Sequence, residues 1–98
     1  MDDLTERQKE ILRFVVGEYV RTATPVSSEA VARRQTLAVS PATIRNEMAV
    51  LEEKGYISHP HTSAGRVPTD RGYRYFVQYL LGKAELEPQE RQDIQQQL

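Results

Sequence analysis

Two side chains with forked hydrogen-bonding groups lie next to each other near the middle of the sequence. Arg45 has the geometry to pair with guanine O6 and N7, and Asn46 with adenine N6 and N7, in the major groove of DNA. Compact neighbours such as Thr43 and Ala49 let a helix backbone approach a groove, and Ser40 with the amides that follow it suits phosphate. The pattern predicts base reading by Thr43, Arg45 and Asn46. An ordinary solvated helix face is the alternative.

A second candidate is the polar loop at residues 59–66, which has two histidines, one arginine and a glycine. This composition is typical of a wing that lies along a DNA backbone or inserts Arg66 into the minor groove. The contacts expected from this loop are His61, Thr62, Ser63 and Arg66. A metal site at His59 and His61 lacks a third ligand, and a plain surface turn is the remaining alternative.

Basic charge collects in the middle of a nearly neutral chain. Thirteen Lys and Arg oppose fourteen Asp and Glu over 98 residues, but residues 33–74 carry seven basic and four acidic side chains. Arg34 and Arg74 are therefore further candidates for contacts with a phosphate backbone. For any single arginine, surface charge without such a role is the commoner case.

The elements that position these residues are predicted from helix start signals. Thr5 and Gln8 have the spacing of a capping box and predict a helix at residues 5–21. Residues 22–26 are expected to form a linker or edge strand, followed by a short helix through about Arg34. Ser40-Pro41 predicts a third helix at residues 41–54, which buries Ile44, Met48 and Leu51 and exposes Ala42, Arg45, Asn46 and Ala49.

The second half of the chain predicts a hairpin and a fourth helix. Residues 56–58 and 66–68 read as two short strands, and Thr69 is a helix cap. Helical spacing places Tyr73, Phe76, Val77 and Leu80 on the inner face of that helix, and Tyr75 and Tyr79 on its outer face. An outer pair of tyrosines favours a docking surface for a second copy or another domain.

This order of elements is that of a winged helix-turn-helix: mainly α, with a small β-hairpin. We expect residues 1–82 to form one winged-helix DNA-binding domain. Residues 83–98 are expected to be a linker, or the start of a following region that is absent from this chain. The alternative is a winged-helix protein-interaction module that uses the Tyr75/Tyr79 face.

Composition excludes several other classes of protein. The sequence has no cysteine, so disulfides, thiolate metal sites and cysteine nucleophiles are absent, and no motif places a nucleophile beside a base. We therefore expect that the protein is not an enzyme and that it binds no cofactor and no metal. No apolar run is long enough to span a bilayer, so a cytoplasmic protein without membrane contact is expected.

Four stretches closely resemble the N-terminal domain of the bacterial heat-inducible transcription repressor HrcA. They are residues 40–49, 51–57, 61–69 and 72–75, and the segments at 4–8 and 25–26 are similar as well. The resemblance implies a homodimer that binds an inverted-repeat operator on double-stranded DNA and represses chaperone operons until heat shock. It also implies that the GroEL chaperonin keeps the repressor active. Carried onto this chain, it makes Thr43, Arg45 and Asn46 the reading residues and residues 63–66 the wing.

Overall fold

The structure is a computed structural model that describes residues 3–33, 39–61 and 64–81, with Leu81 described by its backbone alone. The predictions made for Arg34, Thr62, Ser63 and the segment 83–98 lie outside these residues.

Side-chain caps start the two long helices where the sequence predicts. Helix α1, Glu6–Thr22, begins with a capping box in which the Thr5 hydroxyl accepts from the Gln8 amide at 3.1 Å and the Gln8 side chain accepts from the Thr5 amide at 3.1 Å. Helix α3, Pro41–Glu53, begins at the cap Ser40, and Gly55 follows its end with a φ of 89°. Between them lies the short helix α2, Ser28–Arg33. These boundaries confirm the three helices.

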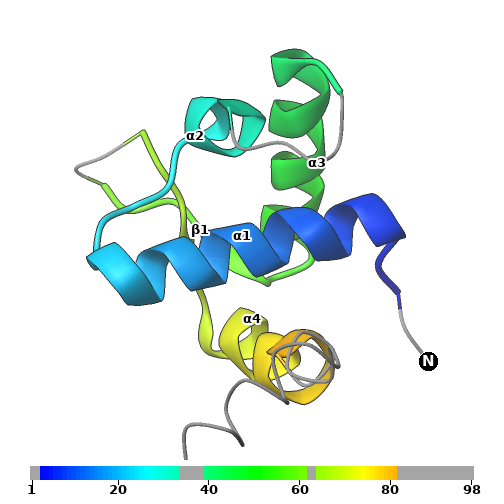
Figure 1. The fold of residues 1–98 in the computed structure, drawn as a ribbon, viewed down its shortest axis with the longest axis vertical. Helices are drawn as coiled ribbons and strands as arrows, with labels where there is room; N and C mark the ends of the chain where they lie inside the picture. Colours follow the sequence, from blue (N-terminus) through cyan, green and yellow to red (C-terminus); the bar gives the residue numbers. More distant parts are fainter. Residues whose placement is uncertain (1–2, 34–38, 62–63, 82–98) are drawn as a thin grey trace, which may run out of the picture.

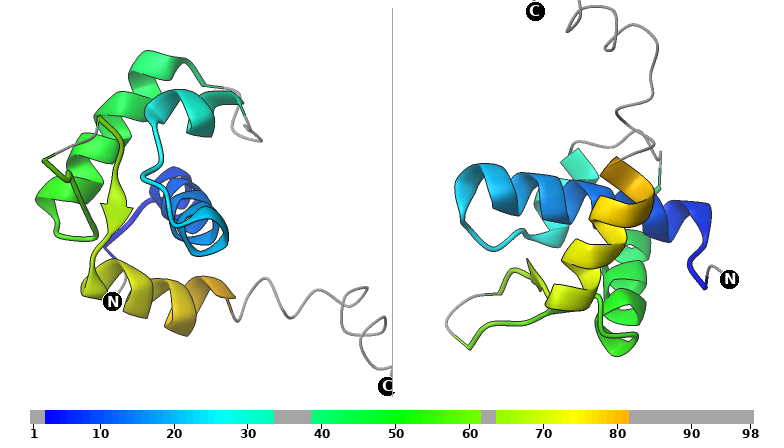
Figure 2. Two further views of the ribbon diagram at one scale, coloured as in Figure 1. Left: turned by 90° about the vertical axis from the view of Figure 1, so that its left-hand side faces the viewer. Right: turned by 90° about the horizontal axis from the view of Figure 1, so that it is seen from below.

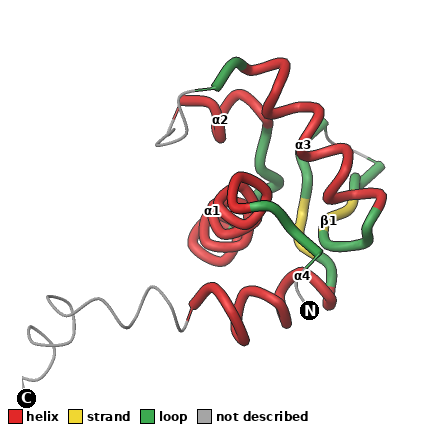
Figure 3. The backbone as a smooth tube through the Cα atoms, turned by 90° about the vertical axis from the view of Figure 1, so that its right-hand side faces the viewer, coloured by secondary structure: helices red, strands yellow, loops and turns green. Residues whose placement is uncertain are grey.

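Helix α1 is the centre of the molecule. Helices α2 and α3 lie on one side of it and α4, Asp70–Tyr75, lies on the other (Figures 1 and 3). The largest fully buried side chains come from helices on both sides of α1, from α1 itself and from the segment after α3. They are Ile11, Leu12, Val15, Val16, Ile44, Leu51, Ile57 and Leu80. Burial of this apolar surface holds α3 in a fixed orientation against α1.

A small antiparallel hairpin follows α3. Strands β1, Ile57–Ser58, and β2, Val67–Pro68, pair in the register Ile57 to Pro68 and Ser58 to Val67. Val26, in the link between α1 and α2, adds a bridge to Arg66, with N–H to O distances of 2.8 and 2.9 Å. The predicted edge strand is thus a single-residue bridge. In the right-hand view of Figure 2 the described residues on either side of the loop tip extend beyond the start of α4.

The prediction for the inner face of α4 was wrong at two positions. Tyr73 and Val77 are 50% and 43% exposed, whereas Tyr75 is only 8% exposed, with its ring edge-on to that of Tyr56 at 5.4 Å. Leu80 is buried as expected. Of the two tyrosines predicted to form a docking face, only Tyr79 is exposed, because Tyr75 is buried. The predicted Tyr75/Tyr79 face is therefore wrong.

Two local features rotate this helix away from the expected phase. Gly72 lies against the backbone of Tyr56, so closely that a Cβ on it would be 2.0 Å from the Tyr56 carbonyl oxygen. This contact turns the side of the helix that holds Gly72 and Tyr75 towards the core. Beyond Tyr75 the chain continues as a π-helix, η1, Phe76–Leu81, whose wider turn changes the spacing of the side chains that face the core; Leu80 is buried there. Neither feature can be predicted from a helical repeat of 3.6 residues per turn.

Candidate nucleic-acid interface

The exposed face of α3 is the one that the sequence predicts. Ile44, Met48 and Leu51 are buried against the rest of the domain, and this fixes which side of the helix faces outward. The side chains on the outward side are Ala42, Arg45, Asn46 and Ala49, all of them exposed. Helix α2 packs against α3 and completes a helix-turn-helix. Two forked polar side chains therefore stand between small residues on one open helix face.

The polar residues of this face differ in how far they are already engaged. Within the described part of the chain, Arg45 and Asn46 form no side-chain hydrogen bond or ion pair. Ser40 Oγ accepts from the Thr43 amide at 3.1 Å and donates to Thr43 Oγ1 at 3.1 Å. Arg45 and Asn46 therefore keep all their donors and acceptors for a ligand, whereas Ser40 and Thr43 also hold the helix start.

Two of the three acidic residues of α3, Glu47 and Glu52, are paired with groups from other elements. Glu47 accepts from Arg7 Nη1 at 3.2 Å and from Gln8 Nε2 at 2.9 Å, both at the start of α1. Glu52 accepts from Arg66 Nε at 2.9 Å. These pairs reduce the negative field beside a face that would meet phosphates. Sequence reasoning missed both pairs, because partners so far apart in the chain leave no local pattern.

The wing residue Arg66 is oriented inward. Besides Glu52, its guanidinium donates to the carbonyl of Ala64 at 2.9 Å. His61, at the start of the loop tip, is exposed. The structure thus brings the wing next to α3, as predicted, with Arg66 directed at α3 and at the backbone of its own loop.

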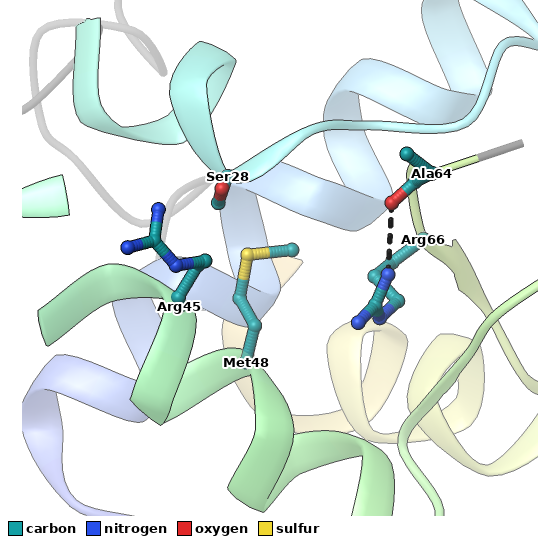
Figure 4. Close-up of a pocket in the computed structure, with 5 residues that line it drawn as sticks. All are labelled: Ser28, Arg45, Met48, Ala64 and Arg66. Carbon is teal, nitrogen blue, oxygen red and sulfur yellow. Dashed lines mark hydrogen bonds between the residues drawn. The ribbon is translucent and has the colours of Figure 1, made fainter. Parts of the chain in front are cut away.

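A small hollow of about 80 Å³ lies between α3 and the wing. Its lining comes from three elements: Ser28 of α2, Arg45 and Met48 of α3, and Ala64 and Arg66 of the wing. Figure 4 shows Arg45 beside Ser28, with Met48 between that pair and the two wing residues. The helix and the wing therefore line the same hollow, and each contributes one arginine to it.

Arg74 is exposed on α4. Helix α4 packs against α1 and against β2 of the hairpin. It lies on the side of α1 away from α2 (Figure 3). Within the described residues, no three His, Asp or Glu side chains come together in a way that could hold a metal ion. In the same part of the chain, none of the helices has the length and apolar character needed to cross a membrane.

A helix-turn-helix followed by a β wing, with free arginine and asparagine side chains on the outer face of the second helix of the motif, defines a winged-helix DNA-binding domain. The chain belongs to the family described as LexA DNA binding domain, which matches residues 1–65. That match runs from α1 through α3 into the wing.

Curated relatives confirm the resemblance to HrcA. The chain is 55% identical over 94 residues to the heat-inducible transcription repressor HrcA of Chloroflexus aggregans, a match that covers 96% of this chain and 25% of that protein. It is 59% identical over 90 residues to the HrcA of Beutenbergia cavernae, covering 92% of this chain and 26% of that protein. The chain thus spans about a quarter of the length of these relatives.

A solved structure shares the fold. A crystal structure described as that of a hypothetical protein superimposes with a TM-score of 0.77 at 46% sequence identity. The match covers 82% of this chain and 26% of that one. The fold class predicted from the sequence, a winged helix-turn-helix, is confirmed.

Proposed function

We propose that this chain is the operator-binding domain of a heat-inducible transcription repressor. The observation that carries the proposal is the outer face of α3, where Arg45 and Asn46 are exposed and unpaired within the described residues while Ile44 and Met48 bury the opposite side. Forked donors and acceptors held rigidly on a helix of this kind are what base-edge recognition in a major groove requires. The repressor names of the curated relatives supply the regulatory context.

In the proposed complex, α3 enters the major groove and the wing lies on the adjacent minor groove or backbone. Thr43, Arg45 and Asn46 read bases. The amides at the start of α3, next to Ser40, approach phosphate, as helix N-termini do. His61 and Arg74 are proposed backbone contacts, together with Arg34, Thr62 and Ser63, which lie outside the described residues.

The proposed mechanism of repression is steric. The domain performs no chemistry: a bound repressor blocks the start of transcription. In the longer protein we propose a homodimer on an inverted repeat, because two-fold symmetry of the protein matches two-fold symmetry of the site. The partnership with GroEL that the resemblance implies stays a prediction.

Fluorescence anisotropy on two labelled duplexes tests this function. One duplex carries an inverted-repeat chaperone operator and the other a scrambled sequence, and both are measured at two salt concentrations. The proposal predicts tighter binding to the operator and an affinity that falls as salt rises. Equal, weak binding of both duplexes by this domain and by an artificially dimerised version would contradict it.

Arg45→Ala and Arg74→Ala form a matched pair of variants, because each removes one exposed cation from a different helix. Arg45→Ala should cost about 1 to 3 kcal/mol on the operator and reduce the preference over scrambled DNA. Arg74→Ala should weaken both duplexes alike, as loss of a phosphate contact does. The assignment of Arg45 to base reading fails if both variants lose affinity uniformly.

A further inference from the structure

The side chain of Arg66 connects the wing to α3. Its Nε donates to Glu52 Oε1 at 2.9 Å, and its Nη1 donates to the Ala64 carbonyl at 2.9 Å, with the Gly65 carbonyl at 3.5 Å. The side chain is 23% exposed and that of Glu52 is 35% exposed. One arginine thus connects a carboxylate in the last turn of α3 with two carbonyls of the wing loop.

The backbone around Arg66 is fixed as well. Its amide and carbonyl both pair with Val26, the residue that leads into α2. The neighbouring Gly65 is buried against Pro25, where a Cβ would lie 2.9 Å from the Pro25 carbonyl carbon. The base of the wing is therefore held by the link between α1 and α2, and the guanidinium adds the direct connection to α3.

We propose that Glu52 and Arg66 are positioning residues, which set the angle between the wing and α3 through their ion pair, and that Arg66 does not itself contact DNA. The inference rests on the proposed function, which needs α3 and the wing to approach one duplex together. Two rigidly related elements bind without the cost of ordering one against the other. Breaking the pair would also leave the Glu52 carboxylate uncompensated beside the proposed phosphate contacts.

The two roles for Arg66 predict opposite results for Glu52→Gln. If Arg66 positions the wing, the variant loses the ion pair and binds the operator about fivefold more weakly. If Arg66 is a DNA contact that Glu52 restrains, the same variant frees a cation, removes a negative charge and binds more tightly.

The experiment compares Glu52→Gln, Arg66→Gln and the double variant by operator anisotropy across a salt series. We expect Glu52→Gln and the double variant to be weakened alike, because each loses the same ion pair. Arg66→Gln should be weakened further, because it also leaves the Glu52 carboxylate uncompensated. In all three variants the slope of log affinity against log salt should stay that of the parent protein. Glu53→Gln is the control, since it makes the same charge change on the neighbouring exposed residue, which forms no ion pair within the described chain. It should not weaken binding.

A readout without DNA separates this proposal from the proposed function. Amide hydrogen exchange at Val26 and Arg66 should accelerate in Glu52→Gln and not in Glu53→Gln, while exchange in the core of α1 stays unchanged. If the parent protein binds no operator, the proposed function fails and the exchange data still decide about the ion pair. Tighter operator binding by Glu52→Gln would overturn the positioning role. So would a slope of log affinity against log salt that is about 0.9 smaller in Arg66→Gln. Unchanged amide exchange at Val26 and Arg66 in Glu52→Gln would also overturn it.

Discussion

At the scale of single residues, Arg45 and Arg66 show how differently two arginines of one surface are used. Both line the hollow between α3 and the wing (Figure 4). Arg66 donates to Glu52 and to the Ala64 carbonyl, whereas Arg45 pairs with nothing in the described chain. The sequence predicted a DNA contact for each. Residue type and spacing contain no information about the Glu52 carboxylate, which pairs with Arg66 from 14 positions away. The difference is a result of tertiary packing.

Another feature of a single residue is the Tyr56 hydroxyl, which connects the N-terminal segment to α4. The Tyr56 hydroxyl donates to Asp3 Oδ1 at 2.9 Å and accepts from Arg71 at 3.2 Å, and the Arg71 guanidinium lies 4.6 Å from the centre of the Tyr56 ring. Burial raises the pKa of this hydroxyl above its ordinary value of 10.0; the hydrogen bond from Arg71 acts against that shift and the bond to Asp3 adds to it.

This shift predicts a loss of stability at high pH that depends on Tyr56. Below pH 10 the hydroxyl is protonated in both states and its stabilising effect is complete; above pH 10 the unfolded chain loses the proton first, so the free energy of unfolding falls. Tyr56→Phe should cost about 1 kcal/mol at pH 7 through its lost hydrogen bonds, and less as pH rises past 10. Urea unfolding of the parent protein and of Tyr56→Phe from pH 7 to 11 measures this. A difference in their free energies of unfolding that stays constant with pH would argue against it.

Among the helices, the starts were predicted, including the Thr69 cap of α4, whereas the side of α4 that faces the core was not. The capping box at Thr5 and the Ser40-Pro41 start place α1 and α3 correctly, because caps are local interactions. The rotation of α4 depends on Gly72 lying against Tyr56, a contact between two different elements. Periodicity alone therefore buried Tyr73 and Val77, which are exposed, and exposed Tyr75, which is buried.

Gly72→Ala tests the reason for that rotation. An added Cβ would lie 2.0 Å from the Tyr56 carbonyl oxygen, so α4 must shift and the free energy of unfolding should fall by about 3 kcal/mol. Gly17→Ala is the matched control, because Gly17 is within α1 and a Cβ there meets nothing within 4 Å. It should stabilise the protein by about 0.5 to 1 kcal/mol. Equal effects of the two substitutions in urea unfolding would show that the close approach is not what positions α4.

At the scale of the whole molecule, α1 separates two surfaces. Helices α2 and α3 lie on one side, with the free Arg45 and Asn46, and α4 with η1 lies on the other, where Tyr73, Val77 and Tyr79 are exposed (Figure 1). The sequence predicted the first surface well, since a single amphipathic helix with a clear start defines it. It predicted the second incorrectly, since that surface depends on the rotation of α4 and on the wider turn of η1.

A titration of isotope-labelled protein with an operator half-site duplex, followed by amide chemical shifts, shows whether the outer face of α3 contacts DNA. If α3 binds in the groove, the largest shift changes should occur in its first turns, around Thr43, Arg45 and Asn46, and in the wing, and high salt should reverse them. Changes confined to Tyr73, Val77 and Tyr79, with α3 unaffected, would contradict binding by α3.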